Sequence, residues 1–221
     1  MRVTRHGHAA LLVECDEVRM LLDPGSYADE SAFALEGVDV VAVTHAHADH
    51  FDPDRLAALH ARNPNAVLCA LPEVIARAGE RWSATVAMEA GRHLDLPGLT
   101  VRAVGGTHDA IHPELPVPGN LGFVLAERDG VSLFHPGDSY AAVPEGVDLL
   151  AVPIAAPWAR LGDTVEFVRR VAPRWVLPIH DAGLAPVWRR YFWSTVLGLG
   201  GAEPAPGLDD GVIEVVASGA R

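Results

Sequence analysis

Four side chains that can bind a metal ion lie close together early in the chain. The segment Val41–His50 reads VAVTHAHADH, so that His45, His47, Asp49 and His50 follow directly on an apolar run. Imidazole nitrogens and carboxylate oxygens are the ligands that Zn²⁺ and similar divalent ions prefer. Residues two apart in an extended segment point the same way, so His45 and His47 can hold one ion. Asp49 and His50 follow at the bend and could hold a second ion.

The residues around this motif place it between a strand and a helix. Asp52 and Pro53 supply an N-cap and a proline at the first helical position, and the spacing of Leu56 and Leu59 predicts a helix to about Arg62. The motif therefore lies on a loop that a buried strand and a helix would hold in place.

Strand-like runs and helical stretches alternate along the chain. Several runs are continuously apolar, which indicates strands covered on both faces, and the helices have one apolar side with which to cover them. We therefore predict an α/β fold built as a layered sandwich. The expected strands are Val3–Arg5, Ala10–Glu14, Arg19–Leu22, Val38–Thr44, Ala66–Ala70, Leu99–Val104, Leu121–Ala126, Val131–Phe134, Leu149–Val152 and Trp175–Ile179, and further helices are expected at Pro72–Gly79, Asp163–Val171 and Pro186–Leu199.

The length and the apolar runs limit the class of protein. A chain of 221 residues is close to the usual size of one domain, so we expect a single domain over 1–221. The longest apolar stretches are far shorter than the ~18–20 residues that a membrane span needs. The N-terminus alternates polar and apolar residues where a signal peptide has a continuous apolar block, so the expected location is cytoplasmic.

The charge balance excludes several functions. Seventeen basic residues stand against 29 acidic ones, and every basic residue is Arg. A net charge of -12 repels phosphate backbones, so no nucleic-acid partner is expected. The lack of Lys excludes Schiff-base chemistry and the phosphate-binding loop that depends on Lys. Cys15 and Cys69 stand among apolar residues, which favours two buried free thiols.

The sequence resembles the metallo-β-lactamase fold superfamily over nearly its whole length. The resemblance rests on five segments in the family's order, which are Leu22–Gly25, Thr44–His50, Gly106–His108, His135–Ser139 and Val176–His180. The opening His6-Gly7-His8-Ala9-Ala10 and the compact length look most like the small bacterial metal-dependent hydrolases related to L-ascorbate-6-phosphate lactonase. The resemblance implies a four-layered αββα sandwich, with metal ligands on loops at one edge of the two sheets.

The resemblance also implies a role for each matched residue. His108, Asp138 and His180 each follow an apolar strand, where a rigid scaffold can position a functional loop. Asp23 would support a ligand His from behind, with plain turn capping as the alternative. The implied ligands are His45, His47 and His108 for a first metal ion and Asp49, His50 and His180 for a second, with Asp138 bridging the two.

The sequence leaves two questions open about His residues near the predicted site. His112 follows His108 by four residues, so either could be the third ligand of the first ion. The motif favours His108 and leaves His112 near the substrate as a proton donor or on the surface. His6 and His8 could approach the site from the first strand or have a plain structural role.

The function that this pattern favours is a metal-dependent hydrolase acting on a small molecule. Two divalent ions, with Zn²⁺ expected ahead of Mn²⁺ or Fe, would lower the pKa of a shared water from about 16 to near 7. The bridging hydroxide would attack an ester, lactone, amide or phosphodiester bond. Asp49 and His112 are the expected catalytic residues, through water orientation or proton transfer.

Two other functions remain as alternatives. One is a non-hydrolytic metal-binding or redox protein with the same ligands. The other is a serine hydrolase built on Ser139, although the segment after Gly137-Asp138-Ser139-Tyr140-Ala141 continues as a loop where a nucleophile elbow leads into a helix. The aromatic residues of the last predicted helix favour a core or subunit contact, so a homo-oligomer is possible.

Overall fold

The first six strands and the last one form a mixed sheet. The computed structural model describes residues 1–128, 130–208 and 212–215, and within them seven strands run in the order β14-β1-β2-β3-β4-β5-β6. β14 and β1 to β3 pair antiparallel, and β3 to β6 pair parallel. The bounds are β1 Arg2–Arg5, β2 Leu11–Cys15, β3 Val18–Leu22, β4 Val40–Val43, β5 Val67–Ala70, β6 Thr85–Ala87 and β14 Val212–Glu214.

Strands β7 to β13 form a second sheet that faces the first, in the order β13-β12-β11-β10-β9-β8-β7. β7 to β10 pair antiparallel and β10 to β13 pair parallel, so β8, β10, β11 and β12 point in one direction. The bounds are β7 His93–Leu96, β8 Leu99–Gly105, β9 Leu121–Glu127, β10 Ser132–His135, β11 Leu149–Pro153, β12 Trp175–Ile179 and β13 Glu203–Pro204.

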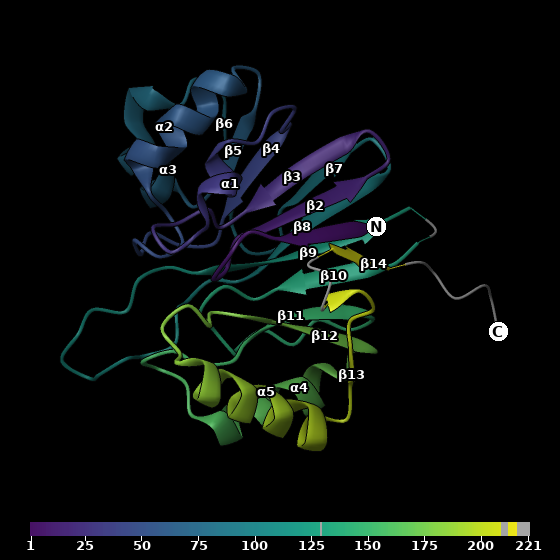
Figure 1. The fold of residues 1–221 in the computed structure, drawn as a ribbon. Helices are drawn as coiled ribbons and strands as arrows, with labels where there is room; N and C mark the ends of the chain where they lie inside the picture. Colours follow the sequence, from purple (N-terminus) through teal and green to yellow (C-terminus); the bar gives the residue numbers. More distant parts are fainter. Residues whose placement is uncertain (129, 209–211, 216–221) are drawn as a thin grey trace.

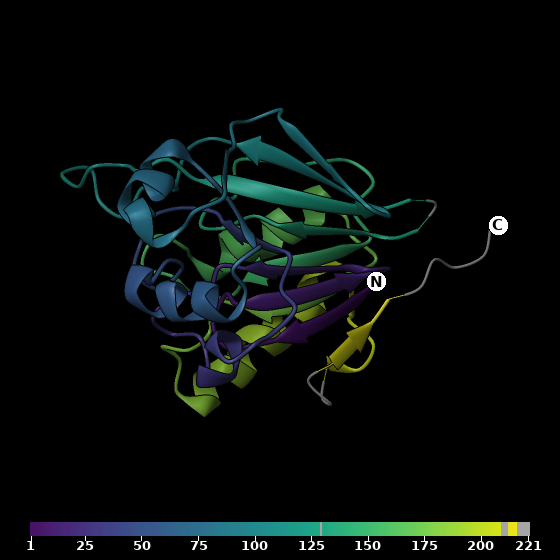
Figure 2. The ribbon, with the colours of Figure 1, turned by 90° about the horizontal axis from the view of Figure 1, so that it is seen from above.

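Helices cover the outer face of each sheet (Figures 1 and 2). On the first sheet lie α1 (Glu30–Phe33), α2 (Pro53–Arg62), α3 (Pro72–Ala78) and the short 3₁₀ helix η1 (Gly79–Arg81). On the second sheet lie α4 (Leu161–Val171) and α5 (Pro186–Gly200). The layers are therefore helix, sheet, sheet and helix, which confirms the predicted αββα sandwich.

Alternate side chains of the buried strands pack into different layers. In β4, Val40 and Ala42 face the core between the two sheets, while Val41 and Val43 face α1 to α3. In β11, by the same alternation, Leu149 and Ala151 lie between the sheets and Leu150 and Val152 pack under α4 and α5. This two-sided burial explains why the strands are continuously apolar.

The strands that the sequence predicts are all present within a residue or two of their expected ends. The short elements were not predicted, namely α1 and the edge strands β6, β7, β13 and β14. The Gly- and Pro-rich segment Gly198–Gly207, which the sequence predicts to be a surface loop, instead contains the end of α5 and the whole of β13. Cys15 and Cys69 are buried free thiols, as expected.

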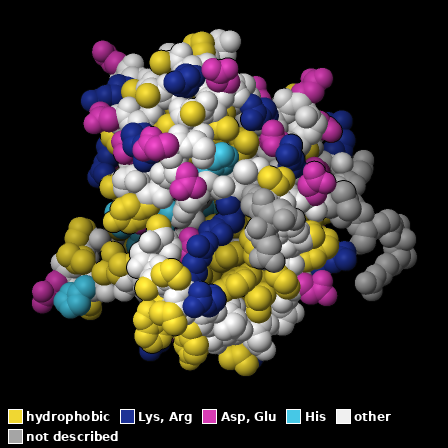
Figure 3. Space-filling view, viewed as in Figure 1, with side chains coloured by type: hydrophobic (Ala, Val, Ile, Leu, Met, Phe, Trp, Pro, Cys, Tyr) yellow, Lys and Arg dark blue, Asp and Glu magenta, His cyan; other side chains and the backbone are white. Residues whose placement is uncertain are grey.

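The outer face of α5 leaves apolar side chains exposed. Trp188 and Tyr191 are each 56% exposed, whereas Phe192 and Trp193 pack against the core under this helix. Figure 3 shows hydrophobic side chains gathered over α5, beside a band of Arg side chains. The aromatic residues of this helix therefore divide between the core and the surface. A subunit contact through the exposed ones stays a prediction.

The helices that the structure describes are all too short or too polar to cross a membrane.

Two backbone hydrogen bonds join the sheets at the edge where the motif lies. The carbonyl oxygen of Thr44, after β4, accepts from the N–H of Leu121 at 2.9 Å. The carbonyl oxygen of His8, after β1, accepts from the N–H of His180 at 3.1 Å. The loops at this edge are thereby held against one another.

Candidate metal centre

The loop between β4 and α2 carries four of the predicted ligands. After Val43 the chain turns, and the backbone N–H groups of His50 and Phe51 both donate to the carbonyl oxygen of His47, at 3.1 and 2.9 Å. α2 then begins at Pro53, where the preceding aspartate accepts backbone N–H groups as an N-cap. The loop is short and anchored at both ends, so it can hold its side chains in fixed positions.

The remaining predicted ligands follow three strands of the second sheet. His108 comes after β8, Asp138 after β10 and His180 after β12. Because these strands point in one direction, the three side chains emerge at the same edge of the sheet. That edge faces the loop after β4.

The structure brings the seven predicted ligands together in two groups, with one further residue. Within each group the ligand atoms lie within 4.8 Å of one another. The first group is His45, His47, His108 and Asp138, and the second is His8, Asp49, His50 and His180.

Asp138 reaches both groups. One of its carboxylate oxygens lies 3.0 Å from Nε2 of His50. The other lies 3.4 Å from Nε2 of His108 and 3.2 Å from Nε2 of His180. The indole N–H of Trp158 donates to this second oxygen at 2.9 Å. A carboxylate in this position can contact ions held by either group.

Asp23 holds the loop and one of its His rings in place through hydrogen bonds to Thr44 and to Nδ1 of His50. Its carboxylate accepts the backbone N–H and the hydroxyl of Thr44, each at 2.7 Å, and lies 2.7 Å from Nδ1 of His50. Asp23 is fully buried, so these contacts are protected from water. The predicted supporting role of Asp23 therefore has a direct geometric basis, since Nδ1–H donation to Asp23 leaves Nε2 of His50 free.

Two further His rings are oriented in the same manner by backbone carbonyl groups. Nδ1 of His108 contacts the carbonyl oxygen of Asp109, and Nδ1 of His180 lies 2.7 Å from the carbonyl oxygen of Ala155. In both rings Nδ1 is the donor, which leaves Nε2 as the nitrogen available to a cation. Such a second contact is typical of metal-binding His.

Several buried polar atoms at the centre face one another at 3.0–3.4 Å without forming a well-aligned hydrogen bond. They are Nε2 of His50, His108 and His180 and the carboxylate oxygens of Asp138. Buried polar groups are normally well hydrogen-bonded, so four residues at one place that are not require an explanation. A divalent cation would satisfy nitrogen lone pairs and carboxylate oxygens together. The residues present therefore fit a metal ion.

Charge coupling within the centre is strong. Burial acts to raise the pKa of Asp138, but the adjacent His50, His108 and His180 rings hold it well below the usual value. Burial likewise opposes the shift at Asp49, where His180 and His8 lower the pKa. Both carboxylates are thus ionised and available to a cation.

The His rings divide into two kinds in the metal-free protein. Burial lowers the pKa of His45 and His47, so these rings are neutral. Burial acts in the same direction on His50 and His180, but Asp138 outweighs it, together with Asp23 at His50 and with Asp49 at His180. The pKa of His50 is raised well above its usual value, and that of His180 is raised to about 9.

His8 is the one member of the two groups that the sequence left open. Its Nε2 lies 3.2 Å from Oδ2 of Asp49, and its ring centroid is 4.1 Å from that of His180. The signal in the sequence was a His-Gly-His turn at a strand end. The decisive contact joins residues 41 positions apart, which no local pattern reveals.

Three non-glycine residues at the centre have left-handed backbone conformations. The φ angles are 48° at His8, 44° at Asp23 and 59° at His180. Such conformations cost on the order of 1–3 kcal/mol each and persist where the surroundings enforce them, often at functional sites. Their coincidence at one place agrees with a functional role for this edge.

His112 lies outside both groups. It is exposed on the long loop between β8 and β9, where its Nδ1 accepts the N–H of Glu114 at 3.2 Å. The structure therefore places His108, and not His112, in the first group of candidate ligands. The catalytic role expected of His112 stays a prediction, without a contact to support it.

Ser139 does not contact a His ring in the hydrogen bonds found among the described residues. Its hydroxyl donates to Asp109 at 3.3 Å and accepts from the N–H of Ala141. Both contacts hold the loop after β10. Among the described residues, no His ring is placed to activate Ser139 as a nucleophile.

Comparisons with known proteins agree with this fold and site. The family model for the beta-lactamase superfamily domain matches residues 2–180. Protein Rv0786c of Mycobacterium tuberculosis is 41% identical over 195 residues, which cover 88% of this chain and 90% of that protein. The UPF0173 metal-dependent hydrolase of Carboxydothermus hydrogenoformans is 28% identical over 194 residues, covering 81% and 84%. The metallo-beta-lactamase fold protein YhfI of Bacillus subtilis superposes with a TM-score of 0.71 at 14% identity, covering 92% and 94%.

The chain belongs to the beta-lactamase superfamily, and its fold is the metallo-β-lactamase fold. It is a metal-dependent hydrolase with two groups of His and Asp side chains suited to metal ions. The finer resemblance to the L-ascorbate-6-phosphate lactonase branch stays a prediction.

Proposed function

We propose that the protein is a dinuclear hydrolase of small molecules. His45, His47 and His108 hold one divalent ion, and Asp49, His50 and His180 hold the other, with Asp138 shared between them. The observation that carries this proposal is the buried cluster of Nε2 atoms of His50, His108 and His180 around the carboxylate of Asp138, which meet at 3.0–3.4 Å without well-aligned hydrogen bonds. They lie where two groups of ligand atoms meet through one carboxylate.

The donor set favours zinc over harder ions. Six imidazoles, counting the five predicted His ligands and His8, meet two carboxylates here, and Zn²⁺ takes nitrogen ligands readily whereas Mg²⁺ and Ca²⁺ prefer oxygen. Bound divalent ions would supply a water nucleophile near neutral pH and would polarise the bond to be cleaved. The bond is an ester, lactone, amide or phosphodiester. The cytoplasmic location and a homo-oligomeric state are also part of the proposal.

The chain's own residues would orient the reacting groups. Asp49 contacts His8 at 3.2 Å and His180 at 3.3 Å, so its carboxylate is held from two sides. Its second oxygen can accept a proton from water or position it. His8, which is buried, acts by keeping Asp49 in this orientation.

A pair of adjacent substitutions tests the proposal. Asp138→Ala removes the shared carboxylate and should abolish hydrolysis of a responsive ester or phosphodiester by the zinc-loaded protein. Ser139→Ala should keep most of the activity, because Ser139 only holds a loop. Loss of activity in Ser139→Ala with activity retained in Asp138→Ala would overturn the proposal in favour of a serine hydrolase.

A further inference from the structure

The cavity beside the second group points to the chemical class of the substrate. We propose, relying on the hydrolase function above, that the substrate is an uncharged carboxylic ester, lactone or amide whose compact apolar group lies in this cavity. A substrate with a charged tail, or a phosphodiester, does not fit the surroundings described below.

The cavity opens directly on metal-binding side chains. Its volume is about 530 Å³, within the range of ~300–1,000 Å³ that small-molecule sites occupy. His8, Asp49 and His180 form one part of its lining. His180 is only 6% exposed, and its Nε2 lies 3.3 Å from Oδ2 of Asp49, so two candidate ligands meet at this end of the cavity. A reacting carbonyl group can reach the metal centre from here.

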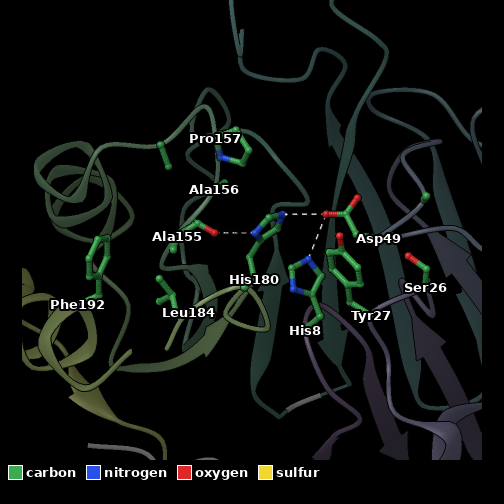
Figure 4. A pocket seen from close by; sticks show the side chains of 13 residues that line it. His8, Ser26, Tyr27, Asp49, Ala155, Ala156, Pro157, His180, Leu184 and Phe192 are labelled. Atoms are coloured by element: carbon green, nitrogen blue, oxygen red, sulfur yellow. Dashed lines mark hydrogen bonds and ion pairs between the residues drawn. The ribbon is translucent and has the colours of Figure 1, made fainter. Parts of the chain in front are cut away.

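The opposite part of the cavity is apolar. The loop after β11 contributes Ala155, Ala156, Pro157 and Ala159, and α5 contributes Phe192. Figure 4 shows the labelled apolar side chains on one side and Asp49, Tyr27 and Ser26 on the other. The small residues of the loop leave room for an apolar group, which gains ~25 cal/mol per Å² of buried apolar surface.

The apolar wall and the metal centre are joined by one contact. The carbonyl oxygen of Ala155 accepts from Nδ1 of His180 at 2.7 Å. The loop that forms the wall therefore also sets the orientation of a ligand ring. A group bound against this loop would lie at a fixed distance from the metal centre.

No Arg side chain lines the cavity among the described residues, and the chain contains no Lys. Arg5 and Arg189 line the adjoining polar cavity, which shares His8 and Tyr27 with this one. Both are bound to Asp181, at 2.9 and 2.7 Å. A charged tail in the apolar cavity would be buried without a partner, which is costly.

In the part of the chain that the structure describes, the cavity offers the charge of a phosphodiester no Arg side chain to bind it. A phosphodiester anion would also approach a chain whose net charge is -12. A neutral carbonyl compound meets neither obstacle.

Binding of three matched amides separates charge from size. Hexanamide, adipic acid monoamide and 6-aminohexanamide share their amide end and differ in the charge of the tail. We expect the zinc-loaded protein, followed by NMR titration, to bind hexanamide at least ~10-fold more tightly than either charged amide. Equal binding of a charged amide would overturn the inference.

Two matched substitutions locate the bound group. Ala156→Leu fills the cavity and should weaken hexanamide binding by about 10-fold or more, because its added atoms occupy the same space. Ala61→Leu makes the same change on the exposed face of α2 and should leave binding unaltered. Thermal unfolding of both variants checks that they fold. Unchanged hexanamide binding in Ala156→Leu would contradict the assignment of this cavity.

Hydrolysis distinguishes this inference from the function on which it rests. p-Nitrophenyl hexanoate should be cleaved faster than bis(p-nitrophenyl) phosphate by the zinc-loaded protein. Preference for the phosphodiester would overturn the substrate class and leave the hydrolase function in place. Cleavage of neither compound by protein with both ions bound would contradict the hydrolase function, while the amide titrations would still decide what the cavity binds.

Discussion

Asp23 shows how a single buried residue can control the centre without being one of its predicted ligands. It holds the backbone and hydroxyl of Thr44 and the ring of His50 at once. Its charge also contributes to the raised pKa of His50. The position and the electron density of a proposed ligand nitrogen therefore both depend on this carboxylate.

Replacing Asp23 by Asn should weaken metal binding while leaving the ligands in place. The neutral amide lacks the charge that polarises His50. Replacing a residue that hydrogen-bonds a metal-ligating His typically lowers the metal affinity by about 10–100-fold. Zinc affinity can be measured by competition with a chromophoric chelator. Asp39→Asn is the matched control, because Asp39 accepts a backbone N–H on the exposed side of the same sheet. Equal affinities of the two variants would contradict the role of Asp23.

His108 and His112 should respond differently to replacement by Ala. His108 is 3% exposed and faces Asp138, so His108→Ala removes a nitrogen from the first ion and should lower its occupancy steeply. His112 is exposed, so His112→Ala should retain both ions and near-normal turnover. Metal content and turnover of both variants check this. A loss of turnover of about 10²–10⁴-fold in His112→Ala with metal retained would instead make His112 a proton donor.

At the scale of elements, the loop after β3 packs tightly against the metal-binding loop. A Cβ atom on Gly25 would lie 2.0 Å from the backbone carbonyl carbon of Asp49 and 2.3 Å from the backbone nitrogen of His50. The N–H of Ser26 donates to the carbonyl oxygen of Ala48 at 2.7 Å. Only glycine permits this approach, so the Asp-Pro-Gly turn sets the position of two ligands.

Gly25→Ala should therefore displace the metal-binding loop and reduce both stability and zinc affinity. The clash is with backbone atoms, which cannot rotate away, so a destabilisation of about 1–3 kcal/mol is expected. Gly162→Ala is the control, since nothing lies near its added Cβ in the exposed first turn of α4. That variant should be neutral or slightly more stable. Urea unfolding and zinc titration of both variants measure the difference, and wild-type zinc affinity in Gly25→Ala would be the contradictory result.

The elements that the sequence predicts well are those with strong local signals. β12 was predicted at its observed bounds because Trp175–Ile179 is continuously apolar between turn residues. α2 was predicted from its cap and its proline. α1 and β13 are only four and two residues long and are stabilised by tertiary contacts, so their own sequences carry little signal.

The residues of the candidate site differ in the same way, since some have a strong local signal in the sequence and others are brought together only by the fold. The four ligands before α2 are adjacent in sequence and form a pattern that indicates metal binding by itself. His108, Asp138 and His180 each needed the family resemblance, because a lone His or Asp after a strand is common. His8 and Trp158 were not assigned, since their contacts to Asp49 and Asp138 exist only after the two sheets pack together.

At the scale of the whole molecule, stability and metal binding are linked through protons. In the metal-free protein the pKa of His50 is raised well above 6.5 and that of His180 is raised to about 9, because neighbouring carboxylates outweigh the effect of burial. The folded protein therefore holds protons that the unfolded chain releases above pH 6.5. This stabilisation is complete below pH 6.5 and is lost as the pH rises toward 9.

The metal-free protein should thus lose on the order of 2–3 kcal/mol of unfolding free energy between pH 6.5 and 9. The lowered pKa values of His45 and His47 act below this window. In zinc-loaded protein the ligands are already deprotonated, so the loss should be absent. Urea unfolding at several pH values, with and without chelator, provides the measurement. A metal-free protein that gains stability over this range would contradict the charge coupling described here.

The central claim is that the two sheets assemble a centre for two metal ions, and metal stoichiometry tests it most directly. Protein purified without added metal, loaded with zinc and freed of excess by gel filtration should retain about two ions per chain by elemental analysis. The double variant His45→Ala/His180→Ala, with one ligand removed from each group, should retain far less, while His60→Ala, a change outside the centre, should match the wild type. Retention of no zinc by the wild type, or of two ions by the double variant, would contradict the claim.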